Sequence, residues 1–232
     1  MRVLIIDCNI DPDSWGSPDL RRMARDCSSA TVFCQRAPQR DLPLSASGFD
    51  KIIISGSKTS ALDDAPWISD LHQFMRKAVS ENKAVLGICY GHQSLIRALG
   101  PEHDQGKALV RRAERAEFGW SLIKTLHPSP LLAGLPEEFY SFSSHFDEAA
   151  ELPAGMKRFA CSEDCEIQAC QLEGHPVFGI QFHPEKDLPG ANRTLAYRKK
   201  VGKPEILLRP ELGSKLYDPK VGETLFRNFL TL

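Results

Sequence analysis

The chain has 232 residues, of which 42% are hydrophobic, and its formal net charge is −1 at pH 7. This hydrophobic content is enough to bury the core of a large α/β domain, and a nearly neutral chain has no global charge that would attract nucleic acid or a membrane surface. Few large apolar residues together with a high net charge would predict disorder, and this composition shows neither.

The amino-terminal segment MRVLIIDCNI does not resemble a signal peptide, because Asp7 interrupts its short apolar stretch. No apolar run approaches the roughly 20 residues that a membrane-spanning helix requires. The seven cysteines are odd in number and irregularly spaced, which favours free thiols in a reducing compartment over a disulfide framework. We therefore expect a cytoplasmic protein that binds neither membranes nor nucleic acid.

Short apolar runs alternate with amphipathic segments through the first hundred residues. The runs predict buried strands, and the segments with apolar residues at helical spacing predict helices. We expect strands at Val3–Asp7, Thr31–Gln35, Lys51–Ser55 and Ala84–Ile88. Helices are expected at Leu20–Cys27, after Asp64 as a cap with Pro66 in the first turn, and at Tyr90–Leu99. This alternation predicts an α/β fold with a mostly parallel, doubly wound, flavodoxin-like sheet and helices on both faces.

The rest of the chain gives shorter signals. Apolar stretches predict strands at Ala108–Arg111, Trp120–Lys124, Phe159–Cys161, Glu166–Leu172 and Val177–Phe182. Residues 186–221 are rich in Pro, Gly and basic residues, and we interpret them as an insertion before a terminal helix at Gly222–Leu232. Without repeats or low-complexity tracts, we expect residues 1–232 to form a single domain.

A cysteine stands at the junction between the predicted strand Ala84–Ile88 and the helix that follows. The pattern Gly87-Ile88-Cys89-Tyr90-Gly91 is the cysteine version of a nucleophile elbow. Glycines are needed there because side chains would clash with neighbouring strands, and the turn places the sulfur over helix N–H groups that favour a thiolate. Free cysteines are more often inert and buried, but the paired glycines in a strand–helix context favour a catalytic Cys89.

A thiol nucleophile needs a base, and the base needs an orienting group. Of the seven histidines, His183 ends an apolar strand, and Glu185 two residues later can share its face. His92 lies on the same helix as the thiol, where the tight turn makes it a poor partner. We therefore predict that His183 is the base and that Glu185 orients it.

GICYGHQ and FGIQFHPE together resemble the signature pair of the class I glutamine amidotransferases, which use Cys, His and Glu in that order. ISGSKTSALDDAPWI is similar to the glycine-rich oxyanion loop of that family, in the version found in GMP synthetase-type amidotransferase domains. SHFDEAAELPAGMKRFACSEDCEIQAC is similar to the substrate-side segment of the same domains. The resemblance extends from the N-terminus to about Glu185 and resumes in the terminal helix.

The resemblance implies that Cys89 attacks the γ-carbonyl of a glutamine-like substrate, that His183 transfers the proton, and that Glu185 fixes the tautomer of His183. Water would then hydrolyse the γ-glutamyl thioester, and no cofactor is expected. The oxyanion would be held by backbone N–H groups of Tyr90 and of the turn at Gly56 and Ser57. The residues expected to bind the substrate are Gln93, Ser144, His145 and Phe146.

Three features depart from the family pattern. Ser57-Lys58 replaces a usual Gly-Pro, which adds a charge near the pocket mouth, and Phe146 replaces a common Gly in the S-H-x-D segment. His145 and Asp147 of that segment fit a solvated turn as well as a direct role. The stretch 186–221 is longer than its counterpart and is compatible with a lid, a partner-docking surface or a solvent loop.

No metal site is expected. Cys161, Cys165 and Cys170 lack the C-x2-C spacing typical of zinc sites, and the last two are predicted to lie on opposite faces of a strand.

Four functions remain to be compared. The first is a glutamine amidotransferase that releases ammonia for a synthetase on another chain, because this chain has no ATP-binding motif or acceptor domain. The second is a stand-alone γ-glutamyl peptidase or hydrolase. The third, a cysteine α/β-hydrolase acting on an ester or lactone, has the acid before the histidine, whereas here Glu185 follows His183. The fourth, a non-enzymatic binding module, conflicts with a complete set of triad residues.

Overall fold

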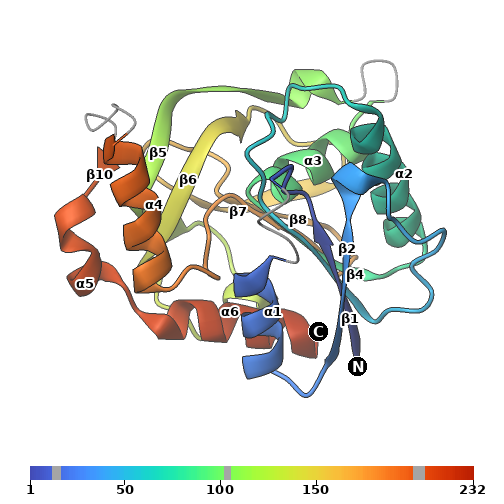
Figure 1. The fold of residues 1–232 in the computed structure, drawn as a ribbon, viewed down its shortest axis with the longest axis horizontal. Helices are drawn as coiled ribbons and strands as arrows, with labels where there is room; N and C mark the ends of the chain where they lie inside the picture. Colours follow the sequence, from blue (N-terminus) through green and yellow to red (C-terminus); the bar gives the residue numbers. More distant parts are fainter. Residues whose placement is uncertain (12–16, 102–105, 201–206) are drawn as a thin grey trace.

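A computed structural model describes residues 1–11, 17–101, 106–200 and 207–232. Its strands are β1 (Arg2–Asp7), β2 (Thr31–Arg36), β3 (Lys51–Ile54), β4 (Ala84–Ile88), β5 (Val110–Thr125), β6 (Glu138–Ala149), β7 (Met156–Cys161), β8 (Ala169–Leu172), β9 (Val177–Ile180) and β10 (Leu207–Leu208). In the described residues these strands form one sheet in the order β10-β5-β7-β8-β9-β4-β3-β1-β2, with β6 paired to β5 (Figure 1).

The sheet has a parallel part that consists of β2, β1, β3, β4 and β9. The side chains of β3 and β4 are buried throughout, because helices cover both faces of this part. The continuous apolar runs of the sequence therefore identified these strands correctly. The predicted α/β class with a parallel, doubly wound core is confirmed.

The other part of the sheet is built mainly from the antiparallel strands β5, β6, β7 and β8. The sequence predicted β5 as two separate pieces and did not predict β6. The signal for β6 is weak because several of its inward side chains are polar: Ser141, Ser143, His145 and Asp147 are all buried. Their polarity hides the period of two that identifies a strand facing a core.

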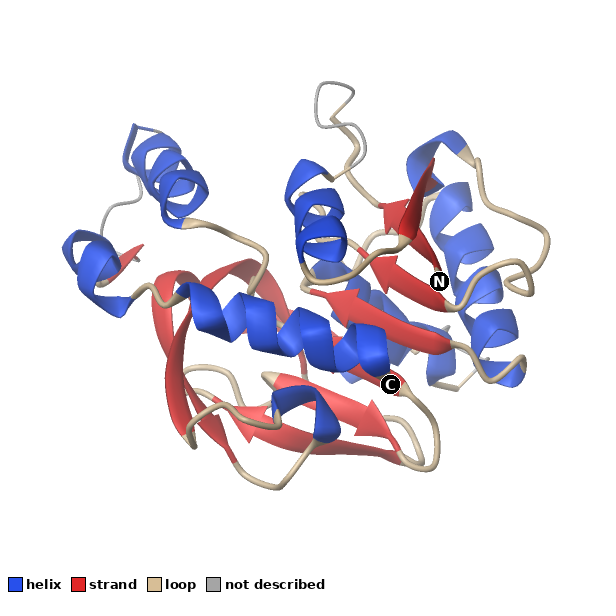
Figure 2. Cartoon of the chain, turned by 90° about the horizontal axis from the view of Figure 1, so that it is seen from below, coloured by secondary structure: helices blue, strands red, loops and turns tan. Residues whose placement is uncertain are grey.

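Helices cover both faces of the sheet, as predicted (Figure 2). α1 (Pro18–Asp26) and α6 (Pro219–Thr231) pack in one hydrophobic cluster, and α2 (Pro66–Ser80) and α3 (Tyr90–Leu99) pack in another. Short 3-10 turns lie at Ala37–Gln39, Lys107–Leu109, Pro130–Leu132 and Pro210–Leu212. Within the described ranges, no helix is both long enough and apolar enough to cross a membrane.

The predicted capping role of Asp64 is wrong. The residue that precedes α2 is Ala65, and its side chain makes no capping bond. The carboxylate of Asp64 instead lies 3.3 Å from the buried guanidinium of Arg97 and also pairs with Lys107. Two cations attract this carboxylate away from the helix end.

The stretch 186–221 contains regular structure in its described residues, whereas residues 201–206 lie outside them. It forms α4 (Leu188–Lys200), the short strand β10 and α5 (Gly213–Leu216). Ala191 and Leu195, four residues apart on α4, pack in a cluster with Trp120 and Phe142. β10 runs parallel to β5, with Leu207 opposite Phe118. Figure 1 shows α4 beside β5 and β6.

Candidate active site

Cys89 lies at the sharp turn between β4 and α3. Its φ of 53° and ψ of −106° form a conformation that non-glycine residues rarely adopt, at a cost of about 1–3 kcal/mol. The N–H of Cys89 donates a hydrogen bond of 2.8 Å to the carbonyl of Ile180 on β9, so the neighbouring strand holds the turn. This strained strand–helix corner has the backbone form of a nucleophile elbow.

The two glycines beside Cys89 are required by close backbone contacts. A Cβ on Gly91 would lie 2.4 Å from the carbonyl oxygen of Ile54 on β3. A Cβ on Gly87 would lie 2.5 Å from the carbonyl oxygen of Gly91 in the first turn of α3. The expected clash with a neighbouring strand therefore holds for Gly91, whereas Gly87 is constrained by the helix that follows it.

His183 and Glu185 follow directly after β9 and pair with each other. The Nδ1 of His183 lies 2.7 Å from Oε1 of Glu185, and the His183 N–H donates to the carbonyl of Phe142 on β6 at 2.7 Å. The His183 ring and Cys89 both face Gly56, where an added Cβ would lie 3.8 Å from Nε2 of His183 and 3.5 Å from Cβ of Cys89. All three side chains are at least nine-tenths buried. The fold thus brings the predicted nucleophile close to the predicted base, and the base close to the carboxylate that orients it.

The opposite charges of His183 and Glu185 stabilise each other. Burial alone would lower the pKa of His183, but the charges of Glu185 and Cys89 raise it to about 10. Burial would likewise raise the pKa of Glu185, yet His183 holds it below its ordinary value. The imidazolium and the carboxylate therefore both stay ionised at neutral pH, and a protonated histidine is ready to give a proton to a leaving amine.

Replacing Glu185 with Gln keeps the shape of the side chain and removes the charge that raises the pKa of His183. The stabilisation that His183 contributes is complete below its unfolded pKa of about 6.5 and is lost as the pH rises toward the folded value. The stabilisation that Glu185 contributes is present above its unfolded pKa of about 4.3 and is lost at lower pH. We expect the unfolding free energy of the wild type to exceed that of Glu185→Gln most between about pH 4.3 and 6.5.

Above this window the two unfolding free energies should converge as the pH approaches the raised pKa of His183. Urea unfolding of both proteins across this pH range measures the difference. The exposed Glu163 provides the control, since Glu163→Gln should shift stability by the same small amount at every pH. A difference for Glu185→Gln that does not change with pH would contradict the assignment of the ion pair.

The turn after β3 lies beside the thiol. Gly56 and Ser57 line the same cavity as Cys89 and His183, and a Cβ on Gly56 would lie 2.9 Å from Cε1 of His183. Tyr90 is the first residue of α3, so its N–H is one of the four at a helix start that have no partner within the helix. The backbone groups predicted for the oxyanion therefore surround Cys89.

Cys89 lies between two cavities. One, of about 250 Å³, is also lined by His183 and Glu185. The other, of about 540 Å³, is also lined by all four residues predicted to bind the substrate, which are Gln93, Ser144, His145 and Phe146. Ser57, Lys58 and Ser144 line both cavities. A substrate in the second cavity would therefore have the thiol in its wall.

Gln93 and Ser144 contact the site through different groups. The Nε2 of Gln93 donates both its hydrogens within the protein, to the carbonyl of Asp147 at 2.5 Å and to Oε1 of Gln181 at 2.9 Å. One amide N–H of Gln93 therefore ties α3 to β6, and the other ties α3 to the residue that follows β9. The carbonyl oxygen of Ser144 lies 3.8 Å from the sulfur of Cys89.

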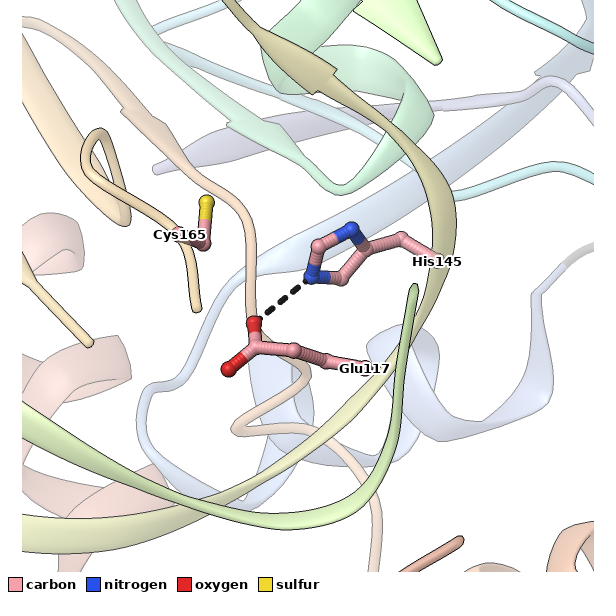
Figure 3. A group of neighbouring side chains, drawn as sticks. All are labelled: Glu117, His145 and Cys165. Atoms are coloured by element: carbon pink, nitrogen blue, oxygen red, sulfur yellow. Dashed lines mark hydrogen bonds and ion pairs between the residues drawn. The ribbon is translucent and has the colours of Figure 1, made fainter. Parts of the chain in front are cut away.

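His145 belongs to a buried polar network (Figure 3). Its Nε2 lies 2.8 Å from Oε2 of Glu117, and its Nδ1 lies 3.0 Å from the carbonyl of Asp147. Ser162 and Gln168 also donate to Glu117. Burial would raise the pKa of Glu117, but the hydrogen bond with His145 holds it below its ordinary value.

The alternative of a solvated turn at His145 and Asp147 is therefore wrong. Both residues lie in β6 and are about 95% buried, because partners on neighbouring elements satisfy their polar groups. With both ring nitrogens of His145 engaged, its side chain fixes the strand that carries Ser144. Glu117, the residue that makes this possible, was not predicted, because its partner lies on a different strand.

Cys165 lies close to the same network. Within the described ranges, Glu117, His145 and Cys165 have possible ligand atoms within 4.8 Å of one another. Both oxygens of Glu117 already accept hydrogen bonds from side chains of the network. The predicted placement of Cys165 and Cys170 on one strand is wrong, because Cys165 precedes β8 and only Cys170 belongs to it.

Asp147 connects the two sides of the larger cavity. Its carboxylate accepts hydrogen bonds from the Ser60 hydroxyl at 2.6 Å and the Ala61 N–H at 2.9 Å, and it lies 2.9 Å from Arg112. The loop after β3 is thereby tied to β6. Arg112 and Arg198 also line this cavity, and the sequence did not identify either. The helix that carries Arg198 begins with Leu-Pro-Gly, a composition typical of a loop, and no local pattern reveals it.

The family model described as "Glutamine amidotransferase class-I" matches residues 20–200. One relative, a subunit of the glutamine-hydrolyzing GMP synthase of Thermococcus kodakarensis, is 41% identical over 104 residues, which are 45% of this chain and 52% of that protein. The corresponding protein from Sulfolobus acidocaldarius is 31% identical over 137 residues, covering 59% of this chain and 68% of that one. The chain thus spans about half the length of the first of these relatives.

Two solved structures have the same fold. A glutamine amidotransferase from Thermotoga maritima has a TM-score of 0.77 at 22% identity, with 99% of this chain and 96% of that one covered. A glutamine amido transferase from Methylobacillus flagellatus has a TM-score of 0.76 at 24% identity, with coverage of 99% and 94%. At these identities the likeness concerns the fold alone.

Proposed function

This chain belongs to the class I glutamine amidotransferase family, and we propose that it hydrolyses the γ-amide of glutamine to glutamate and ammonia through a thioester on Cys89. The observation that carries the proposal is the cavity that the strained Cys89 shares with His183 and Glu185, whose side chains lie 2.7 Å apart. The chain contributes the reactive groups from its own side chains, and the proposal requires no cofactor.

In the first half of the reaction, the sulfur of Cys89 attacks the γ-carbonyl carbon. The oxygen becomes negative and is stabilised by the N–H groups of Tyr90 and of the Gly56–Ser57 turn; one such donor is worth about 3 kcal/mol in the acyl-transfer chemistry of a serine protease. His183 then gives its proton to the nitrogen, the C–N bond breaks, and ammonia leaves. The product of this half is the γ-glutamyl thioester of Cys89.

In the second half, water attacks the thioester carbonyl while His183 accepts a proton from that water. The C–S bond breaks, the thiolate returns beside the protonated His183, and glutamate leaves. Glu185 holds the ring through Nδ1 in both halves, which leaves Nε2 as the nitrogen that exchanges protons with sulfur, amine and water.

The relatives that are GMP synthase subunits suggest the use of the ammonia. We propose that the chain works as one domain and delivers ammonia to a synthetase on a separate chain, as a GMP synthase subunit would. The stand-alone γ-glutamyl hydrolase remains an outcome that the assay separates from this proposal.

The proposal is tested by incubating the purified chain with glutamine and measuring both glutamate and ammonia. Equimolar release of the two is expected, with asparagine as a matched substrate that is one methylene shorter and should be cleaved far more slowly. Release from γ-glutamyl peptides but not from glutamine would assign the chain to the stand-alone hydrolases. Release from no substrate, with or without an added GMP synthetase chain, would overturn the proposal.

A further inference from the structure

Helix α4, from the insertion that the sequence did not explain, presents two different faces. Ala191 and Leu195 lie one turn apart and pack in the cluster of Trp120 and Phe142. Thr194 and Arg198 are also one turn apart, and they line the smaller and the larger cavity respectively. The apolar contacts therefore seat α4 so that its neighbouring face lies along both cavities that meet at Cys89.

The guanidinium of Arg198 lies over two aromatic rings, of which Phe146 lines the larger cavity and Phe118 is buried behind it. Its central carbon is 4.2 Å from the ring centre of Phe118 and 4.8 Å from that of Phe146. The two rings contact each other edge to face, with centres 4.7 Å apart. Stacking of this kind holds the plane of the guanidinium and leaves its N–H edges available, which is how arginine binds carboxylates with two parallel hydrogen bonds.

The other cations of the larger cavity have partners in the protein. Arg112 pairs with Asp147 at 2.9 Å, and Lys58 pairs with Asp11 at 3.7 Å. Across residues 1–11, 17–101, 106–200 and 207–232, no carboxylate forms an ion pair with Arg198 within 4.0 Å. Burial lowers the pKa of Arg198, so this cation would gain from an anion placed beside it.

We propose that Arg198 binds a carboxylate of the substrate whose γ-carbonyl meets Cys89. This inference rests on the proposed γ-glutamyl chemistry and names a specificity residue for it. Two carboxylates can fill the position: the α-carboxylate of the glutamyl group, or the terminal carboxylate of an amino acid attached through the γ-amide. Either would bring the same anion into the cavity that Phe146 and Arg198 line.

The test compares Arg198→Met with the wild type. Met retains an unbranched side chain that can pack on Phe118 and Phe146, and Lys199→Met on the exposed side of α4 removes a charge of the same sign as a control. If Arg198 binds the α-carboxylate, Arg198→Met should raise KM for glutamine roughly 10–100-fold, as the loss of a hydrogen-bonded charge pair does, with kcat within about twofold. Lys199→Met should leave both constants unchanged.

Two substrate series identify which carboxylate is bound. If Arg198 binds the α-carboxylate, the α-amide of glutamine should be hydrolysed with the same KM by wild type and Arg198→Met. If it binds the terminal carboxylate, the variant should lose affinity for γ-glutamylglycine and not for its C-terminal amide. An equal loss on charged and amidated substrates, or a fall in kcat alone, would overturn the assignment of Arg198.

A second readout does not depend on turnover. The rate at which a chloromethyl ketone analogue of glutamine labels Cys89 is followed by intact mass, beside labelling by uncharged iodoacetamide. If Arg198 binds the α-carboxylate, Arg198→Met should slow labelling by the ketone at least tenfold relative to iodoacetamide. Slowed ketone labelling in a chain that hydrolyses no glutamine would refute the proposed activity and support the carboxylate site. Unchanged labelling would exclude the α-carboxylate, and together with an unchanged KM for γ-glutamylglycine it would refute the site.

Discussion

Replacing Cys89 with Ala should lower kcat for glutamine hydrolysis by about a thousandfold or more. The reason is that the sulfur forms the bond on which both halves of the reaction depend, and loss of a nucleophile in a well-studied hydrolase removes about six orders of magnitude in kcat. Glutamate release by the variant and the wild type at saturating glutamine measures the effect. Mass spectrometry should also find no γ-glutamyl adduct on the variant.

The matched control is Cys161→Ala. Cys161 is another unpaired cysteine, half-buried at the end of β7 and away from both cavities around Cys89. This variant should retain kcat within about twofold, because its thiol contacts no group of the site. A Cys89→Ala protein that remains folded and still turns over glutamine at the wild-type rate would exclude the thioester route.

Replacing Gly91 with Ala should destabilise the fold by about 3 kcal/mol, near the upper end for overpacking a buried site. The added Cβ would lie 2.4 Å from the carbonyl oxygen of Ile54, so either α3 or β3 must move. Because Cys89 directly precedes α3 and the Gly56–Ser57 turn follows β3, the same movement should reduce activity. Urea unfolding monitored by circular dichroism gives the free energy.

Gly48 provides the comparison for this substitution. It is exposed, and a Cβ at Gly48 would meet no atom within 4 Å. Gly48→Ala should therefore leave the unfolding free energy unchanged or raise it by up to about 1 kcal/mol, since alanine restricts the unfolded chain. Equal stability of the two variants would show that the turn does not need glycine at position 91.

The parallel part of the fold could be predicted closely from the sequence. The predicted bounds Ala84–Ile88 and Tyr90–Leu99 are those of β4 and α3 in the structure. β4 is recognisable because all its residues are buried. α3 is recognisable because its apolar residues recur at helical spacing between Gly91 and Gly100. Local sequence and burial agree here, and such agreement makes a prediction from sequence reliable.

The antiparallel part and α4 depend on partners far away in the sequence. The buried serines of β6 and His145 read as surface residues unless the opposite strand, with Glu117, is known. α4 begins with Leu-Pro-Gly, a composition typical of a loop, and it is ordered by its contacts with Trp120 and Phe142. No local pattern carries this information, because the stabilising groups are contributed from other elements.

In the candidate site, too, some contacts could be predicted from the sequence and others could not. The neighbourhood of Cys89, His183 and Glu185 could be expected, because the carboxyl ends of adjacent parallel strands meet at one edge of a sheet. β4 and β9, which precede these residues, are indeed paired neighbours. The use of both Gln93 amide hydrogens inside the protein could not be foreseen, since it depends on Gln181 and on a carbonyl of β6.

The packing of α4 and α5 around Trp120 has a consequence for spectroscopy. The indole is 2% exposed, lies in one cluster with Ala191 and Leu195, and has its ring centre 5.9 Å from that of Tyr217. Its fluorescence therefore responds to the seating of the same helix that carries Arg198. The emission of Trp120 is obtained by subtracting the spectrum of Trp120→Phe from that of the wild type. A shift of its emission maximum while a ligand is titrated then reports a change in the packing of α4 on the sheet.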